Sequence, residues 1–528
     1  MEYRNTKHKP WPAGIISRYM AIAVILVSVM TACSSEIDQP VTNDDTRGGR
    51  LWLTLVVPQL SRAGDIYEPG LDNENAIGNL TIFFFNNAAQ GVDGPADTPF
   101  FKTIYVDNGF KNTDKGVLID VPLTDYNYTS GDRIAVVVNM GDLSSMTSLG
   151  ELQSYIPTAT WQTDAQTHLS VNFTMASADN SDGVIIPVDD AAGSDNAQNV
   201  DKYYKAAVSV ERTAARIDLS YDAAQAKESY IEYQSTGDDG AVNGHVRPYG
   251  LSPVNAMQQP SYALKRISDG LSDDYSCFEQ WHYTGTLQQT DNRPTQYVIE
   301  PHTAAKTTWT PVPTEWYGVT SADVMSQGLW NEGLNIAAIL SGGQIVTDAS
   351  GRRAAIVAYT NENTQHYTAH SSKWLTGIML RAVYIPAVVY TDGNAAIAAA
   401  DYKPEQTFWR YRCNDSNNPD GKETSLYFTT YDAAKAYADA RPSGGAEITE
   451  YPSGRCFYHA WIRHTVEERA TAVVFPMEYG IVRNHIYRLS FSFHRAGSPD
   501  ADIDDPQSVE AVIYVRAWNV FVHDQIII

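Results

Sequence analysis

Most of the sequence consists of short runs typical of β-strands, separated by clusters of turn-forming residues. Val, Ile, Thr and aromatic residues dominate the runs, and Asn, Asp, Gly and Pro interrupt them. The clearest runs are Leu80–Phe85, Arg133–Val138, Ala206–Tyr221, Gln296–Glu300, Gly377–Pro386, Ser425–Thr429, Cys456–Ile462, Ile486–Phe493 and Val509–Ile528. Because they do not alternate with helices in βαβ units, the pattern predicts an all-β protein of two β-sandwich domains with Greek-key connections.

Two short helices are expected among these strands. Apolar residues recur at helical spacing in residues 144–156 and 432–440. After Tyr221 the pattern weakens, since Gln225–Pro260 is rich in Gly, Ser and Pro, and a domain boundary is expected near the preceding strand. The expected organisation is a signal peptide (1–33), a propeptide (34–62), an N-terminal sandwich (63–207), a C-terminal sandwich (208–508) and final strands (509–528).

The length and net charge of the chain limit its possible domain organisation and partners. With 528 residues the chain suits two or three domains with cores of their own. Its formal net charge is -24, and the carboxylates are scattered along the sequence. Nucleic acid is therefore excluded as a partner, because no basic face is available to bind phosphates.

The N-terminus has the layout of a secretory signal. Four basic residues precede the apolar stretch Met20–Ala32, whose thirteen residues would cover roughly 20 Å of a hydrocarbon core about 30 Å thick. Ala32 immediately before Cys33 suits a lipoprotein signal peptidase, which would make Cys33 the lipidated residue. A simple secretory signal with an incidental cysteine is the alternative.

An isolated strand precedes a cleavable arginine. Leu51, Leu53, Leu55 and Val57 share one face of a predicted strand that leads into Arg62–Ala63. Four buried side chains of this kind contribute roughly 6–12 kcal/mol to the sheet that they join. Cutting after Arg62 would detach this strand and leave an apolar groove with unpaired backbone groups, which is a template for another strand.

The C-terminus offers such a strand. Val509–Val515 and Trp518–Val522 are successive strand-like runs, and the sequence ends in Ile526, Ile527 and Ile528. Donated by a neighbouring copy, a strand containing Val520, Val522 and these isoleucines would pair in the groove, and the contact would propagate into a filament. The alternative is that both ends pair within the sheet of one monomer.

Motifs for catalysis or metal binding are missing from the sequence. It has no Gly-x-Ser-x-Gly, His-Glu-x-x-His, Walker or dinucleotide-binding pattern, so neither an enzyme nor a cofactor is expected. The acidic run Asp500–Asp505 lacks the glycine and glutamate of a calcium loop. Cys277, Cys413 and Cys456 show no disulfide framework, and both a Cys413–Cys456 bridge and free buried thiols are open.

Several segments, in order along the chain, resemble the fimbrillins of Bacteroidales type V pili, and most closely the shaft subunit of the short (minor) fimbria. They are Val57–Asp65, Ile77–Ile82, Val210–Ile217, Tyr458–Trp461, Gly480–Tyr487 and Val515–Val520. One departure is that only Ala496–Gln507 stands where that subunit carries a Pro- and Asp-rich insert, so the final donor segment could reach less far.

The resemblance implies a transthyretin-like fold of two β-sandwiches and a structural role in adhesion. It implies a palmitate-bearing lipoprotein precursor at the outer membrane, which an arginine-specific protease cuts between Arg62 and Ala63. The subunit would then join an extracellular fimbrium by donor-strand exchange with copies of itself and other fimbrial subunits. Arg47 and Arg50 are competing sites, but cutting there would leave the strand attached.

Three other functions are considered. Tip and anchor subunits share the fold, yet a cleavable strand combined with a strand-rich C-terminus favours a shaft subunit. A glycan-binding surface lipoprotein would use exposed tryptophans, for which Trp374, Trp409 and Trp461 are the candidates. A secreted hydrolase lacks any supporting motif.

Overall fold

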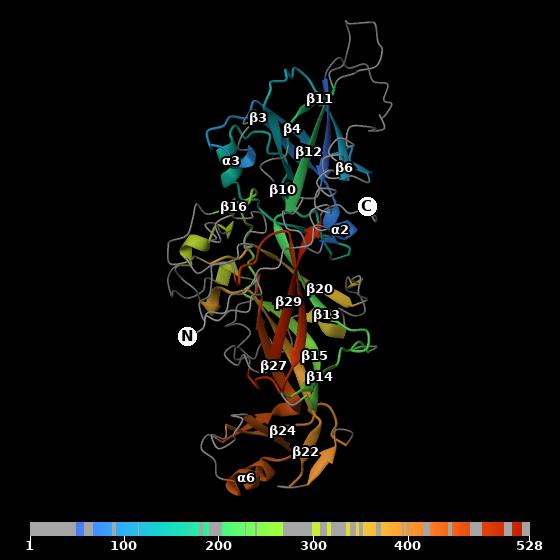
Figure 1. Ribbon diagram of the computed structural model, residues 1–528, viewed down its shortest axis with the longest axis vertical. Coiled ribbons are helices and arrows are strands. Elements are labelled where there is room, and N and C mark those ends of the chain that lie inside the picture. The colour runs from blue at the N-terminus through green and yellow to red at the C-terminus, as the bar shows by residue number, and fades with distance from the viewer. Residues whose placement is uncertain are drawn as a thin grey trace, which may run out of the picture. The chain divides into compact units, whose positions relative to one another are not determined.

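The structure is a computed structural model of the whole chain. It describes residues 49–56, 67–86, 91–113, 116–167, 169–178, 183–188, 203–227, 229–237, 240–267, 298–306, 314–317, 334–337, 345–347, 352–365, 371–392, 395–398, 401–414, 423–441, 446–464, 478–500 and 509–519. All structural statements below concern these residues, and Figure 1 labels some of their strands and helices.

The first sheet contains nine strands and is built from the N-terminal part of the chain. In order across the sheet they are β4 (Lys102–Val106), β3 (Leu80–Asn86), β7 (Asp132–Val138), β10 (Met175–Ser177), β12 (Tyr203–Arg212), β1 (Gly49–Val56), β6 (Gly116–Leu123) and β5 (Lys111–Thr113), while β11 (Ile186–Val188) also pairs with β12. Side chains of β1, β3, β6, β7 and β12 form one apolar core. Alternate residues of β3 and β7 face a second core, to which helix α3 (Leu149–Ser154) contributes Leu149 and Leu152.

The chain passes from the first sheet to the second at Thr213. The predicted strand Ala206–Tyr221 is in fact two strands, because β12 ends at Arg212 in the first sheet and β13 (Ala214–Tyr221) begins in the second. Thr213 is buried, and its backbone N–H donates to the carbonyl of Thr174. The sequence carries no sign of this change of sheet, because buried residues continue from the end of β12 into β13 without a break. The boundary expected between residues 207 and 208 stays a prediction.

The second sheet contains eleven strands. Its main order is β19 (Ile345–Thr347), β20 (Arg353–Asn361), β13, β28 (His485–Phe493), β14 (Tyr233–Thr236), β15 (Val242–Val254), β21 (Gly377–Pro386) and β27 (Arg455–Trp461). Beside this path, β18 (Leu334–Asn335) pairs with β15, β29 (Val509–Asn519) pairs with β28, and β2 (Tyr67–Pro69) pairs with β29. β15 runs through residues 225–260, where the sequence shows no strong strand pattern. Its register shifts between Pro248 and Gly250, so a bulge accommodates the proline.

A smaller sheet is inserted between β21 and β27. It comprises β23 (Ala396–Ala398), β22 (Val388–Tyr390), β25 (Glu423–Phe428), β24 (Phe408–Asn414) and β26 (Glu447–Tyr451). Helix α6 (Tyr431–Asp439), capped by Thr430, packs on one face of this sheet, where Ala433 and Ala434 meet Tyr411 and Phe428. The strand Ser425–Thr429 and the helix at 432–440 were predicted, but their grouping into a separate sheet was not, because sheet membership depends on pairing that the sequence pattern does not show.

The predicted all-β class and both predicted helices are confirmed. Further elements are the four-residue helix α2 (Asp72–Asn75) and the two-stranded pairs β16 (Arg266–Ile267) with β17 (Val298–Ile299) and β8 (Gln162–Thr163) with β9 (Ser170–Val171). Within the described ranges, no helix has the length and apolar character needed to cross a bilayer.

Candidate assembly site around the first strand

Strand β1 lies inside the first sheet with a partner on each edge. It runs parallel to β12 from Arg50 opposite Tyr203 to Val56 opposite Ser209. It runs antiparallel to β6, with Gly49 opposite Leu123 and Leu55 opposite Val117. Figure 1 labels these two flanking strands. Removal of β1 would therefore leave the edges of β12 and β6 facing an unfilled position, with backbone groups unpaired on both sides.

One face of β1 belongs to the core of the first sheet. Leu51, Leu53 and Leu55 are each 0% exposed, and they pack in one cluster with residues of β3, β6, β7 and β12. This confirms the predicted apolar face for these three residues, whereas Val57 lies outside the described residues. Three such side chains stabilise the sheet by roughly 5–9 kcal/mol.

The opposite face of β1 makes two specific contacts with its neighbours. The Arg50 guanidinium donates to both carboxylate oxygens of Asp120 on β6, with Nε to Oδ1 and Nη2 to Oδ2 distances of 2.8 Å each. The Trp52 ring stacks on Tyr203 of β12, with ring centroids 5.0 Å apart. Each flanking strand is thus fastened to β1 by a side chain as well as by its backbone.

The predicted processing residues lie outside the described ranges. Cys33, Arg62 and Ala63 are among them, as are the first 48 residues. The described strand β1 ends at Val56 and β2 begins at Tyr67, so the Arg62–Ala63 bond falls in the connection between these two strands. The two strands pair in different sheets.

Beyond this connection, β2 is held in the second sheet by an ion pair. It pairs in parallel with β29, from Tyr67 opposite Ala517 to Pro69 opposite Asn519. Glu68 in its centre accepts two hydrogen bonds from the guanidinium of Arg488 on β28, at 2.6 Å each. This geometry is bidentate and charge-assisted, which makes it one of the stronger polar contacts a protein forms.

The Arg488 guanidinium begins a buried network of charges that continues to helix α2. Arg488 also donates to Asp218 at 2.8 Å, and Asp218 accepts two hydrogen bonds from Arg216 at 3.0 Å. Arg216 in turn reaches both oxygens of Glu74 on α2, at 3.2 and 3.1 Å. Arg216, Asp218 and Glu74 have fully buried side chains, so the segment that follows the predicted cut is anchored in the interior.

The number of carboxylates around each arginine decides the direction in which the pKa of its guanidinium group is shifted. Burial by itself lowers the pKa of Arg216, but the carboxylates of Asp218 and Glu74 outweigh it and keep that pKa above its usual range. Arg212, with fewer anionic neighbours, shows the opposite balance: burial lowers its pKa to about 9, despite the charge of Glu74. Its side chain donates to Asn75 and to the carbonyl oxygen of Glu74.

Sequence reasoning missed this network. A signal was available, because Arg212 and Arg216 lie in a segment that is predicted to be a strand, and buried arginines require anionic partners. Asp218 lies two residues from Arg216, but Glu74 could not be identified as a partner, since it lies more than a hundred residues away in the sequence.

The C-terminal strand pairs within its own chain. β29 runs antiparallel to β28, from His485 opposite Ala517 to Phe493 opposite Val509. The predicted donor residues Val520, Val522, Ile526, Ile527 and Ile528 follow this strand and lie outside the described residues. The first part of the expected donor segment 509–528 is thus already paired, and residues 520–528 are the part to which the donor prediction still applies.

The remaining candidate residues offer no chemical site. Cys413 and Cys456 are buried in different clusters and are not joined by a disulfide, and burial raises the pKa of the Cys456 thiol to about 12. Cys277 and Asp502–Asp505 lie outside the described residues. In the parts that the structure describes, no three His, Cys, Asp or Glu side chains are grouped to hold a metal.

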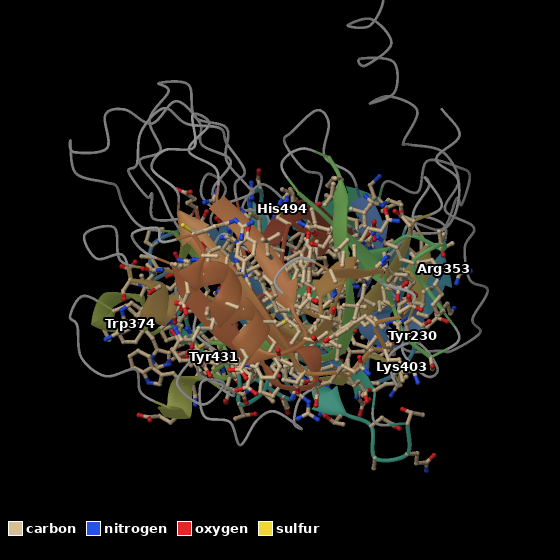
Figure 2. The ribbon with its side chains drawn as sticks, turned by 90° about the horizontal axis from the view of Figure 1, so that it is seen from below. Tyr230, Arg353, Trp374, Lys403, Tyr431 and His494 are labelled. Carbon is tan, nitrogen blue, oxygen red and sulfur yellow. The ribbon has the colours of Figure 1, made fainter. Side chains whose placement is uncertain are left out.

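The tryptophans proposed to stack on sugars are buried to different extents. Trp374, labelled in Figure 2, is 3% exposed and packs with Met257, Tyr317 and Trp316. Trp409 packs against the cluster under α6, and the ring of Trp461 lies edge-on against His459. They come from three separate elements and form no shared platform.

Comparison with known protein families agrees with the predicted resemblance in the C-terminal part of the chain. Residues 449–525 match the family described as major fimbrial subunit protein type IV, fimbrillin, C-terminal. The resemblance to fimbrillins is therefore confirmed, and the match spans the segment from β26 through β29. No curated protein matches the sequence.

Solved structures similar to this chain include three fimbrial proteins of Porphyromonas gingivalis. The fimbrilin FimA is 13% identical with a TM-score of 0.38, covering 91% of this chain and 99% of its own. The tip protein Mfa3, truncated at its C-terminus, is 10% identical with a TM-score of 0.32, covering 89% and 99%. The anchor protein Mfa2 is 9% identical with a TM-score of 0.23, covering 90% and 100%. Similarity this low does not separate shaft, tip and anchor roles.

Proposed function

We propose that this protein is a non-enzymatic shaft subunit of a fimbrium, assembled by donor-strand exchange and supporting adhesion. It is exported as an outer-membrane lipoprotein with palmitate on Cys33. An arginine-specific protease then cuts the Arg62–Ala63 bond, and the subunit joins an extracellular fimbrium. The observation that carries this proposal is the position of β1, which is central in its sheet yet joined to the next strand through the predicted cleavage segment.

Cutting at Arg62 changes how β1 is held. Before the cut, β1 and its sheet belong to one chain, so the strand is always present at its site. After the cut its association becomes bimolecular, and another strand can compete for the edges of β12 and β6. The competing strand must fill the positions of Leu51, Leu53 and Leu55 with apolar side chains.

The same cut leaves β2 and α2 in place. The ion pair of Glu68 with Arg488 and that of Glu74 with Arg216 hold these elements to the second sheet. The cut therefore releases β1 alone, and the second sheet keeps its partner for β29.

The strand that fills the groove is donated by a second copy. Val520, Val522 and Ile526–Ile528 follow β29 and carry the apolar side chains that such a strand needs. Donor and acceptor surfaces differ, so the contact is heterologous and extends into a filament rather than closing as a dimer. A tip subunit needs no donor strand, and an anchor subunit keeps its lipid. A chain with both a cleavable first strand and a C-terminal donor segment is therefore best explained as a shaft subunit.

Limited cleavage of the purified precursor by an arginine-specific protease tests the proposal. The wild-type chain should form a ladder of oligomers on a gel run without denaturing heat. Both Arg62→Ala and deletion of Ile526–Ile528 should remain monomeric, while Arg47→Ala serves as the matched control and should form ladders. Ladders from both altered proteins would refute strand exchange at this site.

A further inference from the structure

Among the residues that the structure describes, the cation that pairs with the carboxylate of Asp120 is Arg50, on the strand proposed to be removed. Arg50 occupies both carboxylate oxygens, and the two side chains are 25% and 18% exposed. Asp120 stands directly opposite Trp52 in the β1–β6 register, and the ring of Trp52 stacks on Tyr203 of β12. The pair is therefore partly withdrawn from water on the outer face of β1.

Release of β1 separates this pair permanently. Arg50 leaves with the strand, because both precede the predicted cut, whereas Asp120 stays on β6. Any strand that replaces β1 covers the same edge again and places one of its side chains against Asp120. A carboxylate that loses water without gaining a cation or a donor weakens binding, and one that gains a cation strengthens it.

We propose that Asp120 selects the incoming strand by requiring a basic side chain at the position of Arg50. This inference rests on the proposed function, and the occupant is the C-terminal segment of a second copy of this chain. Residues 520–528, the part of the C-terminal segment that follows β29, contain one basic side chain, His523. The donor strand therefore enters in a register that brings His523 to Asp120.

The selectivity of the groove is measured first with peptides. A fluorescent peptide of residues 49–57 exchanges into the cut full-length subunit, and binding is followed by polarisation. We expect the peptide to bind roughly tenfold more tightly than the same peptide with Arg50→Met. An Asp120→Asn subunit should bind both peptides equally. Equal binding of the two peptides to the wild-type subunit would overturn the inference.

Assembly is then measured with the same substitutions in the cut protein. Asp120→Asn should slow ladder formation, and His523→Gln should slow it to the same extent when placed in the donor. Asp222→Asn, which removes the exposed carboxylate that pairs with Arg352 next to the end of β13, is the matched control and should assemble normally. Unchanged assembly of Asp120→Asn, or of the His523→Gln donor, would overturn the inference.

These results separate the inference from the proposed function. If the cut wild-type chain forms no ladders, strand exchange fails, while the peptide comparison still reports whether Asp120 selects for a cation. A cooperative thermal unfolding transition of the uncut Asp120→Asn protein confirms that the variant is folded.

Discussion

At the scale of single residues, buried charges and imidazoles are the features that the sequence concealed. Arg216, Asp218 and Glu74 are fully buried, and their stability depends on one another. His459 and His485 lie in the second sheet, where burial lowers the pKa of His459 to about 3 and that of His485 to about 4. A sequence lists such residues but does not tell which will be desolvated.

The buried network predicts a large cost for removing one of its members. Glu74→Gln keeps the shape of the side chain but leaves Arg216 with one carboxylate fewer and weakens the acceptor for Tyr359, which lies 2.7 Å from Glu74. We expect a loss of roughly 3–5 kcal/mol in the free energy of unfolding, measured by denaturant titration. Lys435→Met, which breaks an exposed ion pair on α6, should leave stability unchanged. Equal effects would show that burial of the network is unimportant.

The two histidines predict a loss of stability in mild acid. An unfolded histidine has a pKa near 6.5. Because the folded pKa values of His459 and His485 lie below this, the unfolded chain binds more protons between about pH 6.5 and 4. Stability is therefore full above pH 6.5 and falls as the pH drops, by roughly 1–2 kcal/mol per histidine at pH 5.

Denaturant titrations at pH 7 and pH 5 measure this loss. His459→Asn and His485→Gln should each reduce the difference between the two pH values. His494→Gln, which replaces a half-buried histidine directly after β28, is the comparison. A pH dependence that persists in the double variant would assign the effect to other groups.

At the scale of elements, periodicity predicted what lies within one strand but not what lies between strands. The apolar face of β1 followed from alternation, as did β3, β7, β21 and β28. The break at Thr213, the bulged β15 and the insertion bearing α6 did not, because sheet membership depends on partners far along the chain. Likewise the parallel pairing of β1 with β12, which places the strand inside its sheet, leaves no local signal.

The burial of β1 predicts different costs for its two faces. Leu53→Ala removes a side chain from the centre of the core and should lower the stability of the uncut precursor by roughly 2–5 kcal/mol. Thr54→Ala changes the next residue on the opposite, half-buried face and should cost well under half as much. Thermal unfolding of both variants, uncut, compares the faces, and equal shifts would contradict the register.

At the scale of the whole molecule, β2 and β29, which lie near opposite ends of the sequence, pair in the second sheet while β1 lies in the first. The segment after the predicted cut and the C-terminal strand therefore support each other. The sequence predicted a strand before an arginine and a strand-rich C-terminus. It did not predict that an ion pair would hold β2, because Glu68 and Arg488 are 420 residues apart.

Hydrogen exchange at the backbone amides of β6 tests the central claim most directly. In Ile119–Leu123, the part of β6 beyond its pairing with β5, the amides that face β1 should be protected in the precursor. They should exchange rapidly in cut subunits that lack Ile526–Ile528, after the released strand is dialysed away. In wild-type polymer they should be protected again, because a donated strand replaces β1. Continued protection of these same amides in the cut, truncated monomer would contradict the account.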